Sequence, residues 1–141
     1  MKGSIWSEGR IIPGTKTGEK LEGLSDEIEA AYEEARSCFS INAFTACELV
    51  CRKILMHIGV DKGAEEGKNF ISYLNYLEEK GYITPIIKEW ADLIREIGNQ
   101  STHELIPPDE NRTKATLMFT MELLRIIYEM QHVASKFKKN E

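Results

Sequence analysis

From residue 24 onward, apolar residues recur at intervals of three and four, which is the spacing of one face of an α-helix. Polar or glycine-containing segments separate these stretches. The pattern predicts helices over about residues 25–40, 43–58, 69–80, 85–97 and 108–137. No segment alternates convincingly between apolar and polar positions, as a half-buried strand would. We therefore expect an all-α fold, a bundle of about five helices.

Residues that favour helix ends stand at the predicted boundaries. Ser25 is expected to cap the first helix, and Thr84 followed by Pro85 is expected to begin the fourth. Glycine in the left-handed conformation commonly ends a helix, and the second, third and fourth helices are each followed by one. These expected stops are Gly59, Gly81 and Gly98.

The second predicted helix is apolar around most of its circumference. A helix of this kind belongs in the centre of a bundle, where neighbours cover it on several sides. Its apolar residues are Ala43, Phe44, Ala46, Cys47, Leu49, Val50, Ile54, Leu55 and Ile58.

The region before the helices is rich in glycine and polar residues, which is typical of an extended arm or linker. We expect an arm over residues 1–23, a helical bundle domain over residues 24–137 and a frayed tail over residues 138–141. Trp6, Ile11 and Ile12 are the side chains with which the arm could attach to the body.

Composition narrows the class of protein. The 141 residues suit one domain, and the net charge of −5 argues against a broad nucleic-acid-binding face while leaving room for a small basic site. No apolar run resembles a signal peptide or a membrane helix, so no membrane contact is expected. The three cysteines give no disulfide framework, which indicates free thiols in the cytoplasm.

Cys47 and Cys51 lie one helical turn apart, and His57 follows six residues later. Structural zinc requires four ligands, and no further pair stands nearby. We interpret the cysteines as small buried side chains of a central helix. His57 and His132 stand near predicted helix C-termini, where surface or capping roles are expected. No metal and no cofactor is predicted.

The stretch IREIGNQSTHE, residues 94–104, admits two interpretations. As a helix end, Gly98 stops the helix and Asn99 and its neighbours satisfy the freed backbone groups. As a ribonuclease site, His103 would be the general base or acid and Arg95 would hold the scissile phosphate without a metal. One histidine per chain is few for two proton transfers, so such a site would favour a symmetric dimer that brings two loops together.

Three segments together resemble the HEPN superfamily (higher eukaryote and prokaryote nucleotide-binding domains). They are YEEARSCF at residues 32–39, AFTACELVCRKIL at residues 43–55 and IREIGNQSTH at residues 94–103. The resemblance covers about residues 24–130. It is closer to the bacterial domain-of-unknown-function family numbered four-one-four-five, whose members are often attached to, or encoded beside, restriction and other defence systems. Many members carry a cysteine-rich zinc segment before the helices, which this chain lacks.

The resemblance implies a HEPN-like bundle and a defence-related or RNA-related setting. Active HEPN ribonucleases place four to six residues between the arginine and the histidine, whereas seven residues separate Arg95 from His103 here. We therefore interpret the chain as a non-enzymatic binding module that forms a homodimer. Arg95, Asn99 and His103 would contact RNA phosphate or cap the helix, and the partner would be RNA or a protein of a defence system. The alternative is a metal-independent endoribonuclease that uses Arg95 and His103 across the dimer.

Overall fold

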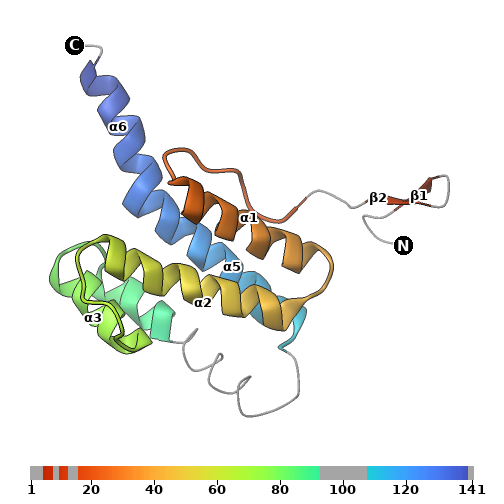
Figure 1. Cartoon of the computed structure of the whole chain (residues 1–141), viewed down its shortest axis with the longest axis horizontal. Coiled ribbons are helices and arrows are strands. Elements are labelled where there is room, and N and C mark those ends of the chain that lie inside the picture. The colour runs from red at the N-terminus through yellow and green to blue at the C-terminus, as the bar shows by residue number, and fades with distance from the viewer. Residues whose placement is uncertain (1–4, 8–9, 13–15, 93–107, 140–141) are drawn as a thin grey trace.

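The computed structural model in Figure 1 confirms the all-α bundle; it describes residues 5–7, 10–12, 16–92 and 108–139. The main helices are α1 (Asp26–Ser40), α2 (Phe44–Asp61), α3 (Phe70–Glu79) and α5 (Glu110–Leu124). Residues 85–92 form a further helix. A π-helical turn, η1 (Arg125–Glu129), joins α5 to α6 (Met130–Lys139). Each of the five predicted helices therefore has a counterpart among the described residues.

Helix α2 occupies the centre of the bundle, as its apolar pattern predicts. It packs against α1, α3 and α5, and α1 also contacts α5 (Figure 1). Its apolar circumference is not fully covered, however. Ala46 is exposed, and 55% of Leu49 is accessible to solvent. One side of the central helix therefore remains at the surface.

The core lies where α1, α2, α3 and α5 face one another. Its largest fully buried apolar side chains are Tyr32, Leu55, Ile58, Leu74, Leu77, Leu117, Leu123, Leu124 and Ile127. Helix α5 also buries Thr113, Thr116 and Thr120. The hydroxyls of Thr116 and Thr120 donate to the backbone carbonyls of Arg112 and Thr116, at 3.2 and 2.9 Å, so these two polar groups are satisfied within the helix.

Side-chain caps fix where the helices begin. The Ser25 hydroxyl accepts a hydrogen bond from the Ile28 N–H, and the Thr84 hydroxyl accepts one from the Ile87 N–H, both at 3.3 Å. Both predicted caps are therefore confirmed. Asn69 and Asp109 cap α3 and α5 in the same way. Each cap satisfies a backbone donor that has no partner inside the helix.

Glycine ends one of the predicted helices but not another. Gly81, with a φ of +82°, follows α3 as predicted. The prediction that Gly59 ends the second helix is wrong, because α2 continues to Asp61. Gly59 lies inside the helix against the ring of Tyr73, and a Cβ at Gly59 would lie 2.6 Å from Tyr73 Cδ1. Its function is close packing of α2 on α3. Gly98 lies outside the described residues.

Three stretches of the predicted arm are described, residues 5–7, 10–12 and 16–23. Strands β1 (Ile5–Ser7) and β2 (Arg10–Ile12) pair antiparallel, with Ile5 opposite Ile12. Residues 16–24, here called the strap, lie along α1 and the end of α5, and Leu21 in the strap is only 3% exposed. The side chains of Trp6, Ile11 and Ile12 lie outside the described part of the chain.

The predicted last helix is continuous but not uniform. It passes through η1 and then projects away from the bundle as α6 (Figure 1). Leu117, Met121, Leu124 and Ile127 are buried, as their spacing predicts. Ala115 and Met130, which belong to the same apolar pattern, are exposed instead. The last turns of this helix therefore carry apolar side chains that the bundle does not cover.

Candidate functional site

The predicted site residues Arg95, Asn99 and His103 lie outside the described residues, so the structure places none of them. Their flanks are described. The helix over residues 85–92 buries Ala91 completely, and α5 begins beside a buried Pro108. The Asp109 carboxylate accepts a hydrogen bond from the Arg112 N–H at 2.8 Å and fixes the first turn of α5. The described residues on either side of the predicted site are therefore anchored in the bundle, through Ala91 before it and Pro108 after it.

A buried carboxylate lies next to the first turn of α5. Glu48, on α2, is only 6% exposed, and its Oε2 accepts a hydrogen bond from the Thr113 hydroxyl at 2.9 Å. Its Oε1 has no hydrogen-bond partner in the described part of the chain. Burial raises the pKa of Glu48, although the Thr113 hydroxyl and the charge of Arg112 oppose the rise. The folded environment therefore favours the protonated form of the Glu48 carboxyl group.

This arrangement gives Glu48 the capacity to exchange a proton at a higher pH than an exposed glutamate. Carboxyl groups with raised pKa values in enclosed surroundings are typical of general acids and bases, although structural networks also produce them. The sequence contains a signal for this residue, because Glu48 is the one acidic side chain among the apolar residues of ACELVC, residues 46–51. Apolar spacing alone does not single it out.

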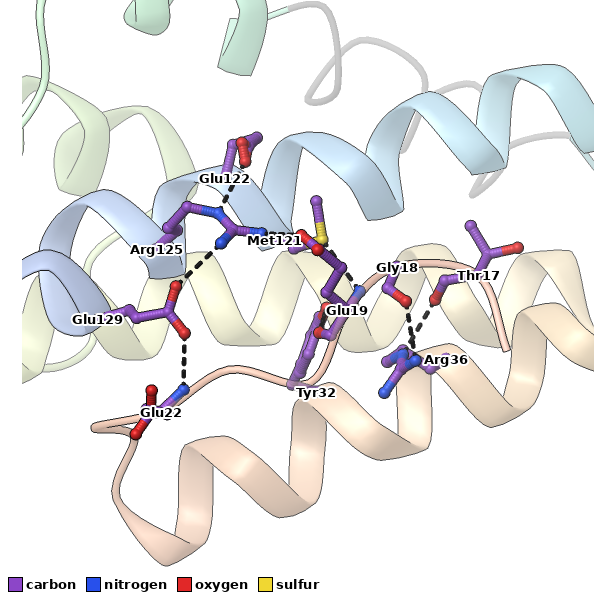
Figure 2. A network of polar contacts seen from close by, with 10 residues as sticks. All are labelled: Thr17, Gly18, Glu19, Glu22, Tyr32, Arg36, Met121, Glu122, Arg125 and Glu129. Atoms are coloured by element: carbon purple, nitrogen blue, oxygen red, sulfur yellow. Dashed lines mark hydrogen bonds and ion pairs between the residues drawn. The ribbon is translucent and has the colours of Figure 1, made fainter. Parts of the chain in front are cut away.

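A second polar cluster holds the strap against α1 (Figure 2). Arg36 is 9% exposed and lies on the same face of α1 as the core residues Tyr32 and Phe39. Its guanidinium donates to the backbone carbonyls of Thr17 and Gly18, both at 2.9 Å. A guanidinium with several such acceptors is well suited to clamp an extended backbone. Arg36 therefore has a structural role.

The strap is also tied to the end of α5 and to η1. The Tyr32 hydroxyl donates to the Glu19 carbonyl at 2.6 Å, and burial raises the pKa of this tyrosine to about 12. Arg125 forms ion pairs with Glu19 and Glu129, and Glu129 accepts from the Glu22 N–H at 2.8 Å (Figure 2). These contacts join strap, α1 and η1 into one unit.

A groove of about 260 Å³ opens between α1 and α2. Ile28, Ala31 and Ile54 form its apolar floor, and ionisable side chains stand around it. One of them, His57, has its Nε2 3.8 Å from a carboxylate oxygen of Glu27. The side chain of His57 is 42% exposed, so the predicted surface position of this histidine agrees with the structure.

Residues 33–140 match a family described as a domain of unknown function, DUF4145. The chain belongs to this family. No curated protein and no solved structure matches the chain. The family match runs from the second half of α1 to the end of α6, so Arg36 and Glu48 lie inside it. The strap carbonyls that Arg36 binds precede the matched residues.

The cysteines of this DUF4145 chain are free thiols, and Cys47 and Cys51 are buried in α2. The pKa of the Cys47 thiol is raised, first by its hydrogen bond to Cys51 and then by burial. A protonated thiol is a poor ligand and a poor nucleophile. Among the described residues, no group of three or more His, Cys, Asp or Glu side chains could hold a metal ion.

None of the helices in the described ranges of the DUF4145 chain combines the length and the apolar content that spanning a bilayer requires.

Proposed function

We propose that this DUF4145 chain is a non-enzymatic HEPN-like interaction module, which acts as a cytoplasmic homodimer in a defence-related or RNA-related system. The binding unit is the helical domain of residues 24–137, with the arm of residues 1–23 and the tail of residues 138–141 on either side. Membership in DUF4145 and the helical bundle support the HEPN-like assignment.

The observation that carries the proposal is a set of exposed apolar side chains in the second half of the chain, of which Trp90 and Ile126 line one cleft. Large apolar patches on a protein surface mark contacts with partners. The residues concerned stand on the helix over residues 85–92, on η1 and on α6, and they are Ile86, Trp90, Ile126, Met130, Val133 and Phe137. The polar clusters built from Arg36 and Arg125, by contrast, bind the chain's own strap and helices. The described surface is thus better suited to binding than to chemistry.

Arg95, Asn99 and His103 belong to the proposal as a binding loop. Arg95 and His103 would contact RNA phosphate and Asn99 would support the loop or cap the preceding helix. A phosphate contact of this kind adds affinity that falls with salt, because counterions are released on binding. The expected result is RNA binding that weakens steeply between low and physiological salt.

The alternative function is a metal-independent endoribonuclease with His103 as acid or base and Arg95 at the phosphate. One structural observation favours acid–base chemistry. The carboxyl group of Glu48, whose pKa is raised by burial, stands beside the first turn of α5. A carboxyl group of this kind is itself a candidate proton donor or acceptor.

The two functions are separated by incubating the purified full chain with total RNA and with a structured tRNA in the presence of a chelator. The His103→Ala variant is the matched sample, and circular dichroism checks that it is folded. The module predicts intact RNA with both proteins. Cleavage by the unmodified chain that the variant loses would overturn the module and establish the ribonuclease.

RNA binding is tested separately by gel mobility shift at low salt. Arg95→Ala should weaken binding at least several-fold, whereas a control substitution of an exposed lysine on α5, Lys114→Ala, should change it little. Equal affinities of the unmodified chain and Arg95→Ala would remove the binding loop from the proposal. The protein-binding role would then depend on the exposed apolar side chains alone.

A further inference from the structure

The exposed apolar residues at the end of the chain form a regular stripe. Ile126, Met130, Val133 and Phe137 follow one another at spacings of four, three and four. Their exposed fractions are 39, 58, 36 and 72%, and we call them the apolar stripe. Alternating steps of three and four are the repeat of a coiled-coil seam, which packs against another helix by inserting side chains between those of its partner.

The strap occupies a different side of the same helix. Gly23 lies so close to His132 that a Cβ there would be 2.6 Å from the His132 Cβ, and Lys136 pairs with Glu22 at 3.0 Å. Lys136 lies about a quarter turn and His132 about a third of a turn away from the apolar stripe. The chain therefore covers one side of α6 with its own strap and leaves the stripe to solvent in the described structure.

The charges beside the stripe change sign along its length. Glu122, Arg125 and Glu129 stand beside its N-terminal half and together carry a net charge of −1, with Arg125 paired to both glutamates. Helix α6 contains lysines and no acidic residue. Lys136 and Lys138 flank the C-terminal half of the stripe. A second copy laid antiparallel would place the lysines of each α6 near the net negative half of the other stripe, whereas a parallel copy would bring the lysines of the two copies together. The charge pattern therefore favours an antiparallel copy as the occupant of the stripe.

An antiparallel pair of stripes would also bring the exposed side chain of Phe137 to a small cleft on the partner copy. In an antiparallel pair, two positions lie opposite each other when they are equally far from the centre of the pairing. The midpoint between Met130 and Val133 is also the midpoint between Ile126 and Phe137. If Met130 lies opposite the partner copy's Val133, Phe137 therefore lies opposite the partner copy's Ile126. A small cleft of about 40 Å³ adjoins Ile126. Its lining residues are Ile87, Trp90, Phe119, Glu122, Leu123 and Ile126. Trp90 and Phe119 pack edge to face there, with ring centroids 6.4 Å apart. Phe137 thus has an apolar recess to enter on the partner copy.

We propose that two copies of this chain associate through antiparallel pairing of their apolar stripes, with Phe137 of each copy seated in the cleft beside Trp90 and Ile126 of the other. This inference deepens the homodimer of the proposed function and assigns its interface. It does not depend on whether the loop of Arg95 and His103 binds RNA. A seam of four side chains and one cleft is smaller than a typical stable interface of about 1,600 Å². The dimer is therefore expected to dissociate on dilution.

The interface is tested by sedimentation of the full chain over a range of concentrations. The unmodified chain should form a dimer, and Met130→Asp and Phe137→Asp should each shift the dissociation to at least tenfold higher concentration. Leu49→Asp is the matched control, because Leu49 on α2 is similarly exposed, at 55%, and lies outside the stripe. All four proteins should show the same helical content and melting behaviour at low concentration. A monomer at all concentrations, or dimerisation unaffected by both stripe variants, would overturn the proposal.

The orientation is tested with spin labels on cysteines introduced at two exposed positions, Gln131 and Lys138. Cys38 is replaced by serine beforehand, so that only the buried Cys47 and Cys51 remain. An antiparallel pair gives a short distance between labels at Gln131 and a distance longer by roughly 10 Å between labels at Lys138, from a rise of 1.5 Å per residue. Equal distances at the two positions would show a parallel pair and overturn the arrangement. If the chain failed to bind or cleave RNA, the expected dimerisation and the expected distances between spin labels would still be the same.

Discussion

The Thr113 hydroxyl on α5 donates a hydrogen bond of 2.9 Å to Oε2 of Glu48 on α2, inside the core. Thr113 is fully buried and Glu48 nearly so, while the second carboxylate oxygen has no hydrogen-bond partner among the described residues. A buried carboxyl group with incomplete hydrogen bonding is less stable in its ionised form than in its protonated form. This pair therefore joins two helices and at the same time makes their packing sensitive to pH.

Replacing Glu48 with glutamine should change how stability depends on pH. The pKa of Glu48 is raised above its ordinary value of 4.5 in the folded chain, so the folded state binds a proton more tightly than the unfolded state. The corresponding stabilisation is complete below about pH 4.5 and is lost as the pH rises through the folded pKa. The Glu48→Gln variant has no carboxyl group at this position, so it does not lose stability through this ionisation as the pH rises. Urea unfolding from pH 4 to pH 8 should show the variant gaining stability relative to the unmodified chain, and parallel curves would contradict the assignment.

Replacing Thr113 with valine should destabilise the chain at neutral pH. The substitution keeps the size of the side chain but leaves the Glu48 carboxylate without its donor, at a cost of about 1–3 kcal/mol. Thr116→Val is the matched control, because the Thr116 hydroxyl donates only to a carbonyl of its own helix. The free energies of unfolding of both variants are measured in urea. Equal losses in the two variants would show that the bond to Glu48 adds nothing.

Removing the Arg36 guanidinium should loosen the strap. Arg36→Met keeps most of the apolar stem and deletes the hydrogen bonds to the carbonyls of Thr17 and Gly18. The loss should be about 2 kcal/mol, within the range for bonds to a charged group. Trypsin should also cut after Lys16 and Lys20 several-fold faster. Lys114→Met, on the exposed face of α5, is the control, and unchanged cleavage in Arg36→Met would contradict the clamp.

Adding one methyl group at Gly59 should destabilise α2, although alanine favours helices more than glycine does. The new Cβ would lie 2.6 Å from a ring atom of Tyr73, so the two helices must move apart. We expect a loss of about 1–3 kcal/mol from overpacking. In the Tyr73→Ala background the same substitution should become neutral or stabilising. An equal loss in both backgrounds would show that the Tyr73 contact is not the cause.

Apolar spacing was sufficient to predict the helices because amphipathic periodicity and capping residues act locally. Ser25 and Thr84 cap helices where the sequence indicates, and α2 lies at the centre as its apolar circumference predicts. Gly59 was misassigned because a glycine needed for close packing and a glycine that ends a helix have the same local signal. Only the position of Tyr73, fourteen residues later, distinguishes the two cases.

The polar part of the interior could not be predicted in the same way. Arg36, Glu48 and Thr113 count as surface residues in any apolar pattern, yet each is buried against a partner distant in the sequence. Arg36 stands beside Ala35 on the apolar side of α1, which is a weak signal for a buried charge. The binding loop of Arg95, Asn99 and His103 remains a sequence-based prediction.

The π-helical turn η1 acts as a phase shift between the two parts of the last helix. Such a turn contains about one residue more than the α-helical path would, so deleting one residue within Arg125–Glu129 would restore a uniform helix. Such a deletion would leave the later side chains in their present directions, whereas a uniform α-helix that kept all its residues would rotate each of them by about 100° around the axis. In that uniform helix, Met130, Val133 and Phe137 would turn to a neighbouring side while the core contacts of α5 stayed in place. The direction in which this protein presents its apolar surface is thus set by a single turn of backbone, independently of the residues that form that surface.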